Sequence, residues 1–327
     1  MKKIINDPNR VVSDMLRGIA AVNPKVEYFP EAEVIASKEK REKVGVISGG
    51  GSGHEPAFGG YIGRGMLSAA VAGNVFASPS PDRIIKGIEE ANGGKGVLAV
   101  IMNYSGDLMN FDMAKEMAEM EGIDVEIVVV KDDVAVPDRE DATGRRGIAG
   151  TLLVHKVAGA KAEAGGTLAE VAAVAQKAID RVRTMGMSMS SCTIPAVGKP
   201  GFALGDDEIE IGMGIHGEPG IERTGVKSAK ELAAILIEKI TADYDYSGSE
   251  VAVMVNGLGA TPLMELYILA GEAEAVLKEK GIRPWRWFVG NYMTSLEMAG
   301  CSITLLKLDD ELKELIDAPC EAPAFRV

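Results

Sequence analysis

The sequence predicts an α/β protein made of two α/β domains, each with a sheet flanked by helices. Short apolar runs typical of buried strands alternate with longer segments that have helical periodicity. Repeated strand–helix units of this kind indicate a parallel sheet with helices on both faces. A chain of 327 residues also exceeds the usual size of a single hydrophobic core, which indicates two domains.

The first half of the chain has the clearest alternation. Its apolar spacing predicts a helix at 10–22, after which strand–helix units begin. In the helix that begins near Pro81, Ser80 is expected to be the N-terminal cap. Further helices are expected at 110–121, 148–164 and 168–184. Strands are expected at 44–48, 69–76, 97–103 and 125–130.

The second half repeats this alternation less regularly. Residues 185–201 contain small residues and two prolines without clean periodicity, so we place the domain boundary there. The predicted domains are therefore 1–184 and 185–327. One strand is expected to begin at 208, and further strands are expected at 251–260, 285–291 and 301–308. Helices are expected at 229–244 and 263–280.

Charge and cysteine content limit the partners and the location of the protein. The net charge of −13 argues against nucleic acid and an anionic membrane as partners. Cys192, Cys301 and Cys320 are scattered, form no metal-binding pair and suit a reducing compartment. The first ten residues lack the apolar core of a signal peptide, and no apolar run reaches membrane-spanning length. We therefore expect a cytoplasmic protein.

The most informative segment is the strand and glycine-rich turn at 44–56, VGVISGGGSGHEP. Glycines at the end of a strand allow positive φ angles and bring the backbone close to a ligand. Their spacing fits neither the dinucleotide motif G-x-G-x-x-G nor a P-loop. His54 adds a titratable group beside the exposed N–H groups. The alternative is a glycine-rich turn that only packs the strand against its helix.

Asp107 is a second candidate for the functional site. It follows the strand at 97–103, as His54 follows the strand at 44–48. The carboxyl ends of parallel strands share one edge of a sheet, where the ligands of open α/β sheets bind. An imidazole and a carboxylate at this edge can together remove a proton from a hydroxyl group. In the alternative interpretation, Asp107 only caps the following helix.

His216 is a third candidate and lies in the sequence GMGIHGEPG (212–220). Glycines on both sides keep bulky side chains away from its imidazole, which favours contact with a ligand. The alternative is a core histidine whose nitrogens are satisfied by backbone hydrogen bonds. His155 lies in an apolar helical segment and is expected to be structural. The three histidines lack paired metal-ligand spacing, so no metal site is predicted.

Other polar and sulfur-containing residues receive structural interpretations. The acidic pair at 132–133 is expected in a solvated turn, and Arg145 and Arg146 are expected on the surface. The sixteen methionines, several of which lie within 109–120, are expected to fill the core.

Five longer motifs follow one another along nearly the whole chain. They are SGGGSGHEPA (48–57), GNVFASPS (73–80), NYSGDLMNF (103–111), RRGIAGTLLVHKVAG (145–159) and GMGIHGEPG (212–220). Together, and in this order, they resemble the dihydroxyacetone-binding subunit of dihydroxyacetone kinases, also called glycerone kinases. Several long motifs are far more specific than a single glycine turn.

The resemblance implies a two-domain subunit, usually a homodimer, that holds its ketone substrate covalently. It implies that His216 attacks the carbonyl carbon through Nε2 and gives a hemiaminal. It assigns His54 and Asp107 to the terminal hydroxyl group that receives phosphate. A neutral imidazole can attack a ketone, whereas glycerol has no such carbon, so this capture would select ketoses. The residues expected to line the substrate site are Gly51, Ser52 and Gly53.

Met102 departs from the family pattern, because members commonly have a substrate-contacting lysine at this position. The loss of this cation leaves two alternatives open. One is a kinase subunit for a larger ketose such as erythrulose. The other is a non-catalytic relative that binds the ketose as a sensor or coactivator of a transcription regulator.

The resemblance also implies partners for the chain. The sequence contains neither a P-loop nor a kinase catalytic loop, although phosphoryl transfer needs metal and cationic clamps. Mg²⁺ and ADP or ATP are therefore expected on a separate nucleotide-binding subunit, and no cofactor on this chain. The donor is either ATP itself or phosphoenolpyruvate acting through a phosphotransferase component.

Overall fold

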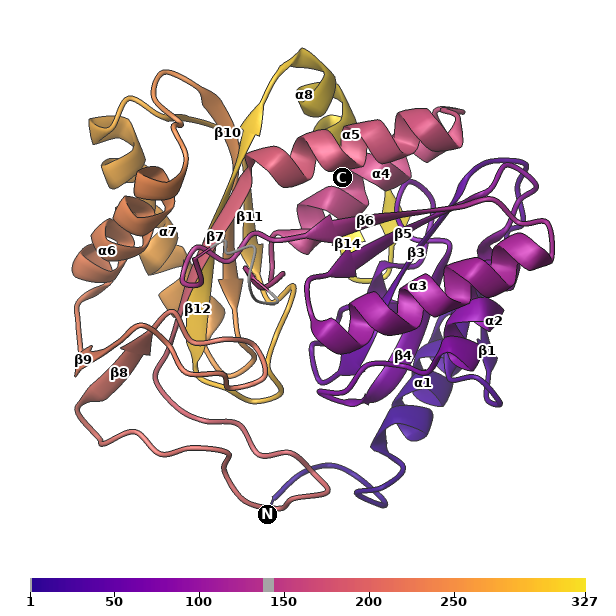
Figure 1. The fold of residues 1–327 in the computed structure, drawn as a ribbon. Coiled ribbons are helices and arrows are strands. Elements are labelled where there is room, and N and C mark those ends of the chain that lie inside the picture. Colours follow the sequence, from indigo (N-terminus) through magenta and orange to yellow (C-terminus); the bar gives the residue numbers. More distant parts are fainter. Residues whose placement is uncertain (1, 138–143) are drawn as a thin grey trace.

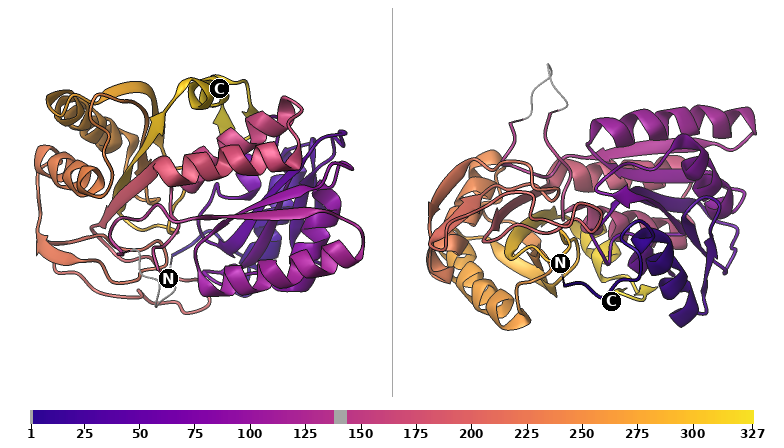
Figure 2. Two further views of the ribbon diagram at one scale, coloured as in Figure 1. Left: turned by 45° about the horizontal axis from the view of Figure 1, so that its top comes forward. Right: turned by 90° about the horizontal axis from the view of Figure 1, so that it is seen from below.

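The computed structural model describes residues 2–137 and 144–327. Two six-stranded sheets lie side by side, with helices on their outer faces and between them (Figure 1). Views along two other directions show the same two halves (Figure 2). The prediction of an α/β fold with two helix-flanked sheets is confirmed.

The first sheet has the strand order β1-β2-β4-β3-β5-β6. Its strands are β1 (Val26–Phe29), β2 (Val34–Ser37), β3 (Gly45–Ser52), β4 (Ala69–Val75), β5 (Val97–Met102) and β6 (Val125–Val130). The strands from β4 to β6 pair in parallel, as the repeated units predict. The antiparallel edge formed by β1 and β2 was not predicted, because four-residue strands are too short to show a period.

Helices cover both faces of this sheet. They are α1 (Val11–Val22), α2 (Pro81–Ala91), α3 (Ser105–Met120), α4 (Thr151–Glu163) and α5 (Leu168–Arg181). Helices α2 and α3 pack on one face, and α1, α4 and α5 on the other. Ser80 is the N-cap residue of α2, but its side chain makes no capping hydrogen bond. Helix α3 begins five residues earlier than predicted, which places Asp107 in its first turn.

The second sheet has the order β11-β10-β12-β7-β8-β9 and is mostly antiparallel. Its strands are β7 (Val182–Ser188), β8 (Glu208–Ile211), β9 (Glu222–Gly225), β10 (Glu250–Gly257), β11 (Arg283–Gly290) and β12 (Gly300–Leu308). The prediction that the preceding helix extends to Thr184 is wrong. Residues from Val182 onward are extended because they pair with β12. The predicted boundary at 184–185 falls within β7, and the division of the chain there stays a prediction.

The two sheets share one apolar core. Helices α6 (Ala229–Asp243) and α7 (Leu263–Glu279) cover the outer face of the second sheet, whereas α5 contacts both β6 and β12. The largest apolar cluster joins Val46 and Leu98 of the first sheet to Met254 and Leu306 of the second. The chain closes with α8 (Asp310–Asp317) and a hairpin of β13 (Glu321–Ala322) and β14 (Phe325–Arg326). This shared core fixes how the loops of the two sheets face each other.

The surface expectation for the acidic pair at 132–133 and the arginines at 145–146 is wrong. All four side chains are buried. Asp132 accepts two backbone N–H groups at the start of α4, and Arg145 forms a two-pronged ion pair with Asp243. Sequence periodicity missed them because charged residues enter an interior only when each one finds a partner far along the chain.

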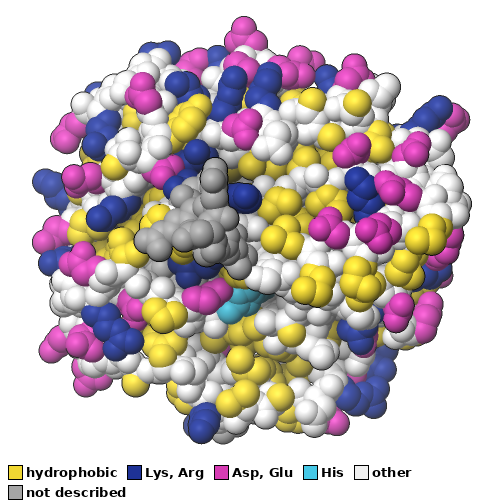
Figure 3. Space-filling model, viewed as in Figure 1, with side chains coloured by type: hydrophobic (Ala, Val, Ile, Leu, Met, Phe, Trp, Pro, Cys, Tyr) yellow, Lys and Arg dark blue, Asp and Glu magenta, His cyan; other side chains and the backbone are white. Residues whose placement is uncertain are grey.

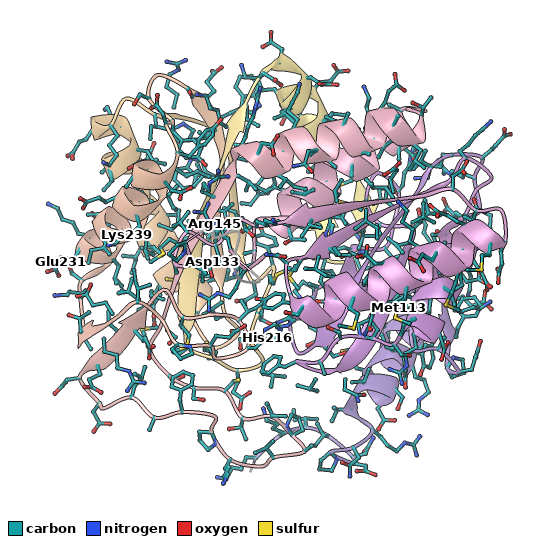
Figure 4. The ribbon with its side chains drawn as sticks, in the orientation of Figure 1. Met113, Asp133, Arg145, His216, Glu231 and Lys239 are labelled. Carbon is teal, nitrogen blue, oxygen red and sulfur yellow. The ribbon has the colours of Figure 1, made fainter. Side chains whose placement is uncertain are left out.

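The core expectation for the methionines is also wrong on α3. Met109, Met113 and Met120 are 63%, 51% and 83% exposed, and Met113 can be seen on the outer face of this helix (Figure 4). Elsewhere methionines such as Met185 and Met254 are fully buried. A methionine count alone therefore does not tell the two faces of a helix apart.

Candidate active site

The candidate site lies where the two sheets meet, at the carboxyl end of β3. Most of the glycine turn belongs to the last residues of β3, which ends at Ser52, and His54 follows after Gly53. Strands β3 and β5 are parallel neighbours, so His54 and Asp107 follow strands that end at the same edge. His216 comes from the second sheet, in the segment between β8 and β9 (Figure 4). The structure thus brings together the two histidines that the sequence separates by 162 positions.

The two histidines face each other through their Nε2 atoms, which are 3.0 Å apart. His54 is fully buried, whereas the side chain of His216 keeps 19% of its surface exposed. In the space-filling view a patch of histidine surface shows between the two halves, where Figure 4 places His216 (Figure 3). A ligand arriving from solvent therefore meets His216 first and finds His54 behind it.

Aromatic rings enclose the histidine pair. Phe76 stacks on His54 with 5.2 Å between ring centroids, and Tyr104 meets His216 edge-on at 4.7 Å. Phe76 has a φ of 59°, and its ring leaves no room for a side chain at Gly53, whose φ is 105°. Burial, together with the charge of His216, lowers the pKa of His54 to about 3. His54 therefore stays uncharged at neutral pH.

A loop of the second sheet determines which ring nitrogen of His54 carries the proton. The Nδ1 atom of His54 lies 2.8 Å from the carbonyl oxygen of Thr294, in the loop between β11 and β12. A carbonyl oxygen only accepts hydrogen bonds, so Nδ1 carries the proton and Nε2 presents its lone pair to the site. The backbone N–H of Thr294 donates in return to the carbonyl oxygen of His54.

Asp107 is a buried carboxyl group at the edge of this site. It is 3% exposed, and its Oδ1 atom has no hydrogen-bond partner among the described residues. Burial raises its pKa to about 6, although a hydrogen bond from Ser78 and the charge of His216 act in the opposite direction. Helix α3 has Tyr104 as its N-cap residue, so Asp107 is not the cap that the alternative interpretation required.

Asp107 and Met102 both lie near Gly50. A Cβ atom added to Gly50 would lie 3.7 Å from both Asp107 Oδ2 and Met102 Cε. Met102 is buried in the main apolar core.

The remaining residues of the glycine turn are held by backbone contacts. A side chain at Gly51 would collide with the backbone of Phe76 and Ala77. The hydroxyl group of Ser52 donates to the carbonyl oxygen of Gly73 at 2.8 Å. These contacts shape the turn, and the contact of Gly51, Ser52 and Gly53 with substrate stays a prediction.

His155 lies inside α4, with its ring edge-on to Phe58 at 5.7 Å between centroids. It is fully buried, and this burial lowers its pKa to about 3, so it remains uncharged at neutral pH. Within 2–137 and 144–327, no three His, Cys, Asp or Glu side chains are grouped to hold a metal ion. In the same residues no helix has the length and apolar character needed to cross a bilayer.

Sequence reasoning missed several residues around the histidine pair. Phe76, Tyr104 and Glu218 all lie within the motifs that carried the resemblance, so a signal existed without a role attached to it. Glu218 is the most important of them, because its Oε1 atom accepts a hydrogen bond from Nδ1 of His216 at 2.9 Å. Thr294 had no signal, since it acts on His54 through a backbone carbonyl group that any residue has.

Comparison with known proteins identifies the family. Residues 17–324 match the Dak1 domain, and the chain belongs to this family. The chain is 53% identical over 314 residues to the dihydroxyacetone-binding subunit DhaK of the PTS-dependent dihydroxyacetone kinase 1 of Listeria innocua, and 95% of each chain is covered. The family resemblance drawn from the motifs is therefore confirmed.

Solved structures support the same assignment. The dihydroxyacetone kinase of C. freundii matches with a TM-score of 0.91 and 35% identity, over 99% of this chain and 60% of that chain. The dihydroxyacetone kinase operon co-activator Dha-DhaQ matches with a TM-score of 0.90 and 38% identity, over 95% and 97% of the two chains. One fold thus serves both a kinase and a co-activator.

Replacing Asp107 by asparagine is expected to stabilise the protein above pH 6. The folded-state pKa of about 6 lies above the ordinary value of 3.8, so the wild-type protein loses stability as the pH rises between these values. Asp107→Asn removes this loss and should raise the free energy of unfolding at pH 7 by about 2–3 kcal/mol, with little change near pH 3. Urea unfolding between pH 3 and 8 measures this difference. Asp112→Asn, on the exposed side of α3, is the control, and parallel curves for wild type and Asp107→Asn would contradict the expectation.

Proposed function

We propose that this chain is the substrate-binding, catalytic subunit of a dihydroxyacetone (glycerone) kinase, a phosphotransferase with an alcohol group as acceptor. The observation that supports this most is the orientation of His216. Its Nδ1 atom is bound by Glu218 and its Nε2 atom faces the site, beside His54. The name of the Listeria innocua relative supports dihydroxyacetone as the ketose.

The first step in this proposal is covalent capture of the ketone. Nε2 of His216 attacks the carbonyl carbon and forms a hemiaminal, which a polyol without a carbonyl group cannot do. Capture therefore selects ketoses over glycerol by chemical reactivity, where pocket shape alone would discriminate weakly. It also fixes the substrate, so little orientational freedom remains to be lost when phosphate is transferred.

The second step is removal of a proton from the terminal hydroxyl group. Asp107 offers an Oδ1 atom without a partner among the described residues, and His54 offers the lone pair of Nε2. With a pKa of about 6, Asp107 is ionised at pH 7 yet remains a usable base. Gly51, Ser52 and Gly53 line the substrate in this proposal.

The phosphoryl group comes from a partner in this proposal. A nucleotide-binding subunit brings Mg²⁺ with ADP or ATP over the exposed side of His216, and this chain itself holds no cofactor. The relative named PTS-dependent supports a phosphotransferase component that supplies the phosphate from phosphoenolpyruvate. A cytoplasmic location is part of the proposal because the nucleotide and this component must be within reach.

Two alternatives remain next to this proposal. Met102, near Gly50, is apolar where the family resemblance implies a lysine, which favours a larger ketose such as erythrulose as the substrate. The likeness to the co-activator Dha-DhaQ favours a sensor that binds a ketose without turnover. The presence of both His54 and Asp107 argues for the kinase, since a sensor needs no proton-accepting pair.

Covalent capture can be tested by carbon-13 NMR with dihydroxyacetone labelled at its carbonyl carbon. The wild-type protein should convert the carbonyl signal into a tetrahedral one, and His216→Ala should abolish this conversion because the nucleophile is gone. Asp107→Asn is the matched control and should still capture the ketone. An untouched carbonyl signal in wild type excludes dihydroxyacetone as the captured ligand. Labelled erythrulose then shows whether His216 captures a larger ketose.

Turnover separates the kinase from the sensor. With a nucleotide-binding subunit from a relative and its phosphoryl donor, the wild-type chain should form dihydroxyacetone phosphate. Asp107→Asn and His54→Ala should each lower the rate by about 10²- to 10⁴-fold, since each removes a proton-accepting group. Capture in the NMR experiment without any phosphorylated product, with either ATP or phosphoenolpyruvate as donor, would favour the sensor.

The proposal also includes a homodimer, and an exposed face of helix α7 is its candidate interface. Leu263, Met264, Tyr267 and Ile268 are 54%, 70%, 62% and 52% exposed. Their spacing places them on one stripe of the helix, on the outer side of the second sheet (Figure 1). Neighbouring large apolar side chains of this kind are typical of interaction surfaces, and a two-fold axis lets such a stripe pack against its own copy.

The double substitution Tyr267→Asp and Ile268→Asp is expected to convert the dimer into a monomer. Two carboxylates facing their symmetry mates would be buried without partners, which outweighs the apolar contact. Light scattering coupled to gel filtration gives the mass directly. Met113→Asp, an equally exposed position on α3, should leave the dimer intact. A wild-type monomer, or a dimer that survives the double substitution, would rule out this face.

A further inference from the structure

We propose that Glu218 is a positioning residue that fixes the Nδ1 proton of His216 and balances the positive charge that the site carries both before and after His216 adds to the ketone. The guanidinium group of Arg146, which is itself paired with Asp133, favours the ionised state of Glu218. The proposal rests on the proposed function for its chemical step. Its structural part, the placement of protons in the ligand-free site, can be tested without any ketone.

Glu218 binds His216 at two points. Its Oε1 atom accepts from Nδ1 of the imidazole at 2.9 Å, and its Oε2 atom accepts from the backbone N–H of the same residue at 2.9 Å. The carboxylate therefore fixes both the ring and the backbone of His216. A carboxylate has no proton to donate, so Nδ1 of His216 must carry the hydrogen, and the reactive nitrogen is Nε2.

Arg146 lies near Glu218 and is itself held by a buried ion pair with Asp133. The guanidinium group of Arg146 donates through Nε to Asp133 Oδ2 at 2.8 Å and through Nη2 to the carbonyl oxygen of Gly212 at 2.9 Å. Both Arg146 and Glu218 reach over Gly214, where an added Cβ atom would collide with the two side chains. Glycine at this position is thus required for the carboxylate and the guanidinium group to lie close together.

These contacts decide the charge of Glu218. Burial on its own would raise the pKa of this carboxyl group. The hydrogen bond and charge of His216, together with the charge of Arg146, outweigh burial and lower the pKa to about 2. Glu218 is therefore a carboxylate at every pH at which the protein would work.

Because both Nδ1 atoms carry protons, the number of protons between the two Nε2 atoms can be inferred. His54 donates from Nδ1 to Thr294 and His216 donates from Nδ1 to Glu218, so neither ring has a proton left for Nε2. Two lone pairs facing each other at 3.0 Å would repel, whereas one additional proton turns this contact into a hydrogen bond. The ligand-free pair therefore holds one shared proton. It lies on the side of His216, because Glu218 supplies the countercharge there, whereas burial lowers the pKa of His54 to about 3.

The shared proton allows the capture step to proceed without a change in the charge of the site. The shared proton first moves from Nε2 of His216 to Nε2 of His54, which breaks the N–H bond and frees the lone pair of His216. Nε2 of His216 then forms a bond to the carbonyl carbon, and the C=O π electrons move to oxygen. The proton between the rings passes to this oxygen and gives the hydroxyl group of the hemiaminal. The His216 ring ends as an imidazolium with Nδ1–H and Nε2–C bonds, paired with the Glu218 carboxylate. The charge of the site is the same before and after, and no external acid or base is consumed.

The test compares Glu218→Gln with Glu218→Asp and the control Glu222→Gln, an exposed glutamate on β9. Nitrogen-15 NMR of the histidine rings in the ligand-free proteins should show Nδ1 of His216 protonated in wild type and the shared proton on the Nε2 pair. Glu218→Gln keeps an acceptor for Nδ1 but removes the charge, so the shared proton should be lost. Glu218→Asp should restore it in part, and Glu222→Gln should match wild type.

Capture of carbonyl-labelled dihydroxyacetone provides the second measurement. Glu218→Gln should weaken capture about 10- to 100-fold, the usual effect of losing one charge-assisted hydrogen bond, and Glu218→Asp should recover part of it. A wild-type histidine spectrum in Glu218→Gln overturns the proposal, as does an Nδ1 atom of His216 without a proton in wild type. If wild type shows the expected protons but captures neither dihydroxyacetone nor erythrulose, the proposed function fails and the proton assignment stands.

Discussion

The loop that follows β3 and the loop that precedes β12 are joined by four hydrogen bonds, and the site depends on them. Thr294 accepts from Nδ1 of His54, returns a backbone hydrogen bond to the same residue, and donates its hydroxyl group to the carbonyl oxygen of Glu55. Leu296 donates to the carbonyl oxygen of Gly53 at 2.7 Å. Because the core is continuous between the sheets, these loops cannot separate without exposing apolar surface. The second sheet therefore sets the tautomer of a histidine that belongs to the first.

The two carboxyl groups nearest the histidines have opposite environments. Burial dominates at Asp107 and raises its pKa to about 6. At Glu218 burial acts in the same direction, but His216 and Arg146 outweigh it and lower the pKa to about 2. Titratable groups whose pKa values are pushed apart usually have different roles in a reaction. Asp107 suits proton transfer, whereas Glu218 suits a permanent countercharge.

The sequence predicted the parts of this fold that have a local cause. Alternating apolar runs indicated the parallel strands β3 to β6, and glycine spacing singled out His54 and His216. The short edge strands β1 and β2 lack a period, and the predicted helix runs on into β7 because the pairing of β7 with β12 is a long-range effect. The surface prediction for Asp132 and Arg145 is wrong for a similar reason, since Asp132 binds the start of α4 and Arg145 binds Asp243. Their partners are set by tertiary packing, which no local pattern records.

The site residues follow the same division. Candidates on a turn with an unusual composition were found, and residues that act through another residue were missed. Glu218 is two positions from His216, yet its role depends on the way the backbone folds back on itself, and Thr294 contributes only a carbonyl oxygen. The role of such supporting residues cannot be predicted from their position in the chain. Other side chains at the same positions would leave the hydrophobic pattern and the glycine spacing unchanged.

In the mechanism that we propose, capture of the ketone prepares the site for phosphoryl transfer through one shared proton. While the site is empty, the proton between the rings occupies the Nε2 lone pair of His54 as a hydrogen bond. Addition of the ketone to His216 removes that proton to the substrate oxygen. His54, which is fully buried, is then left uncharged with an open Nε2. In this proposal the capture step frees the Nε2 lone pair of His54 as a base for the transfer step, and only in molecules that already hold a substrate.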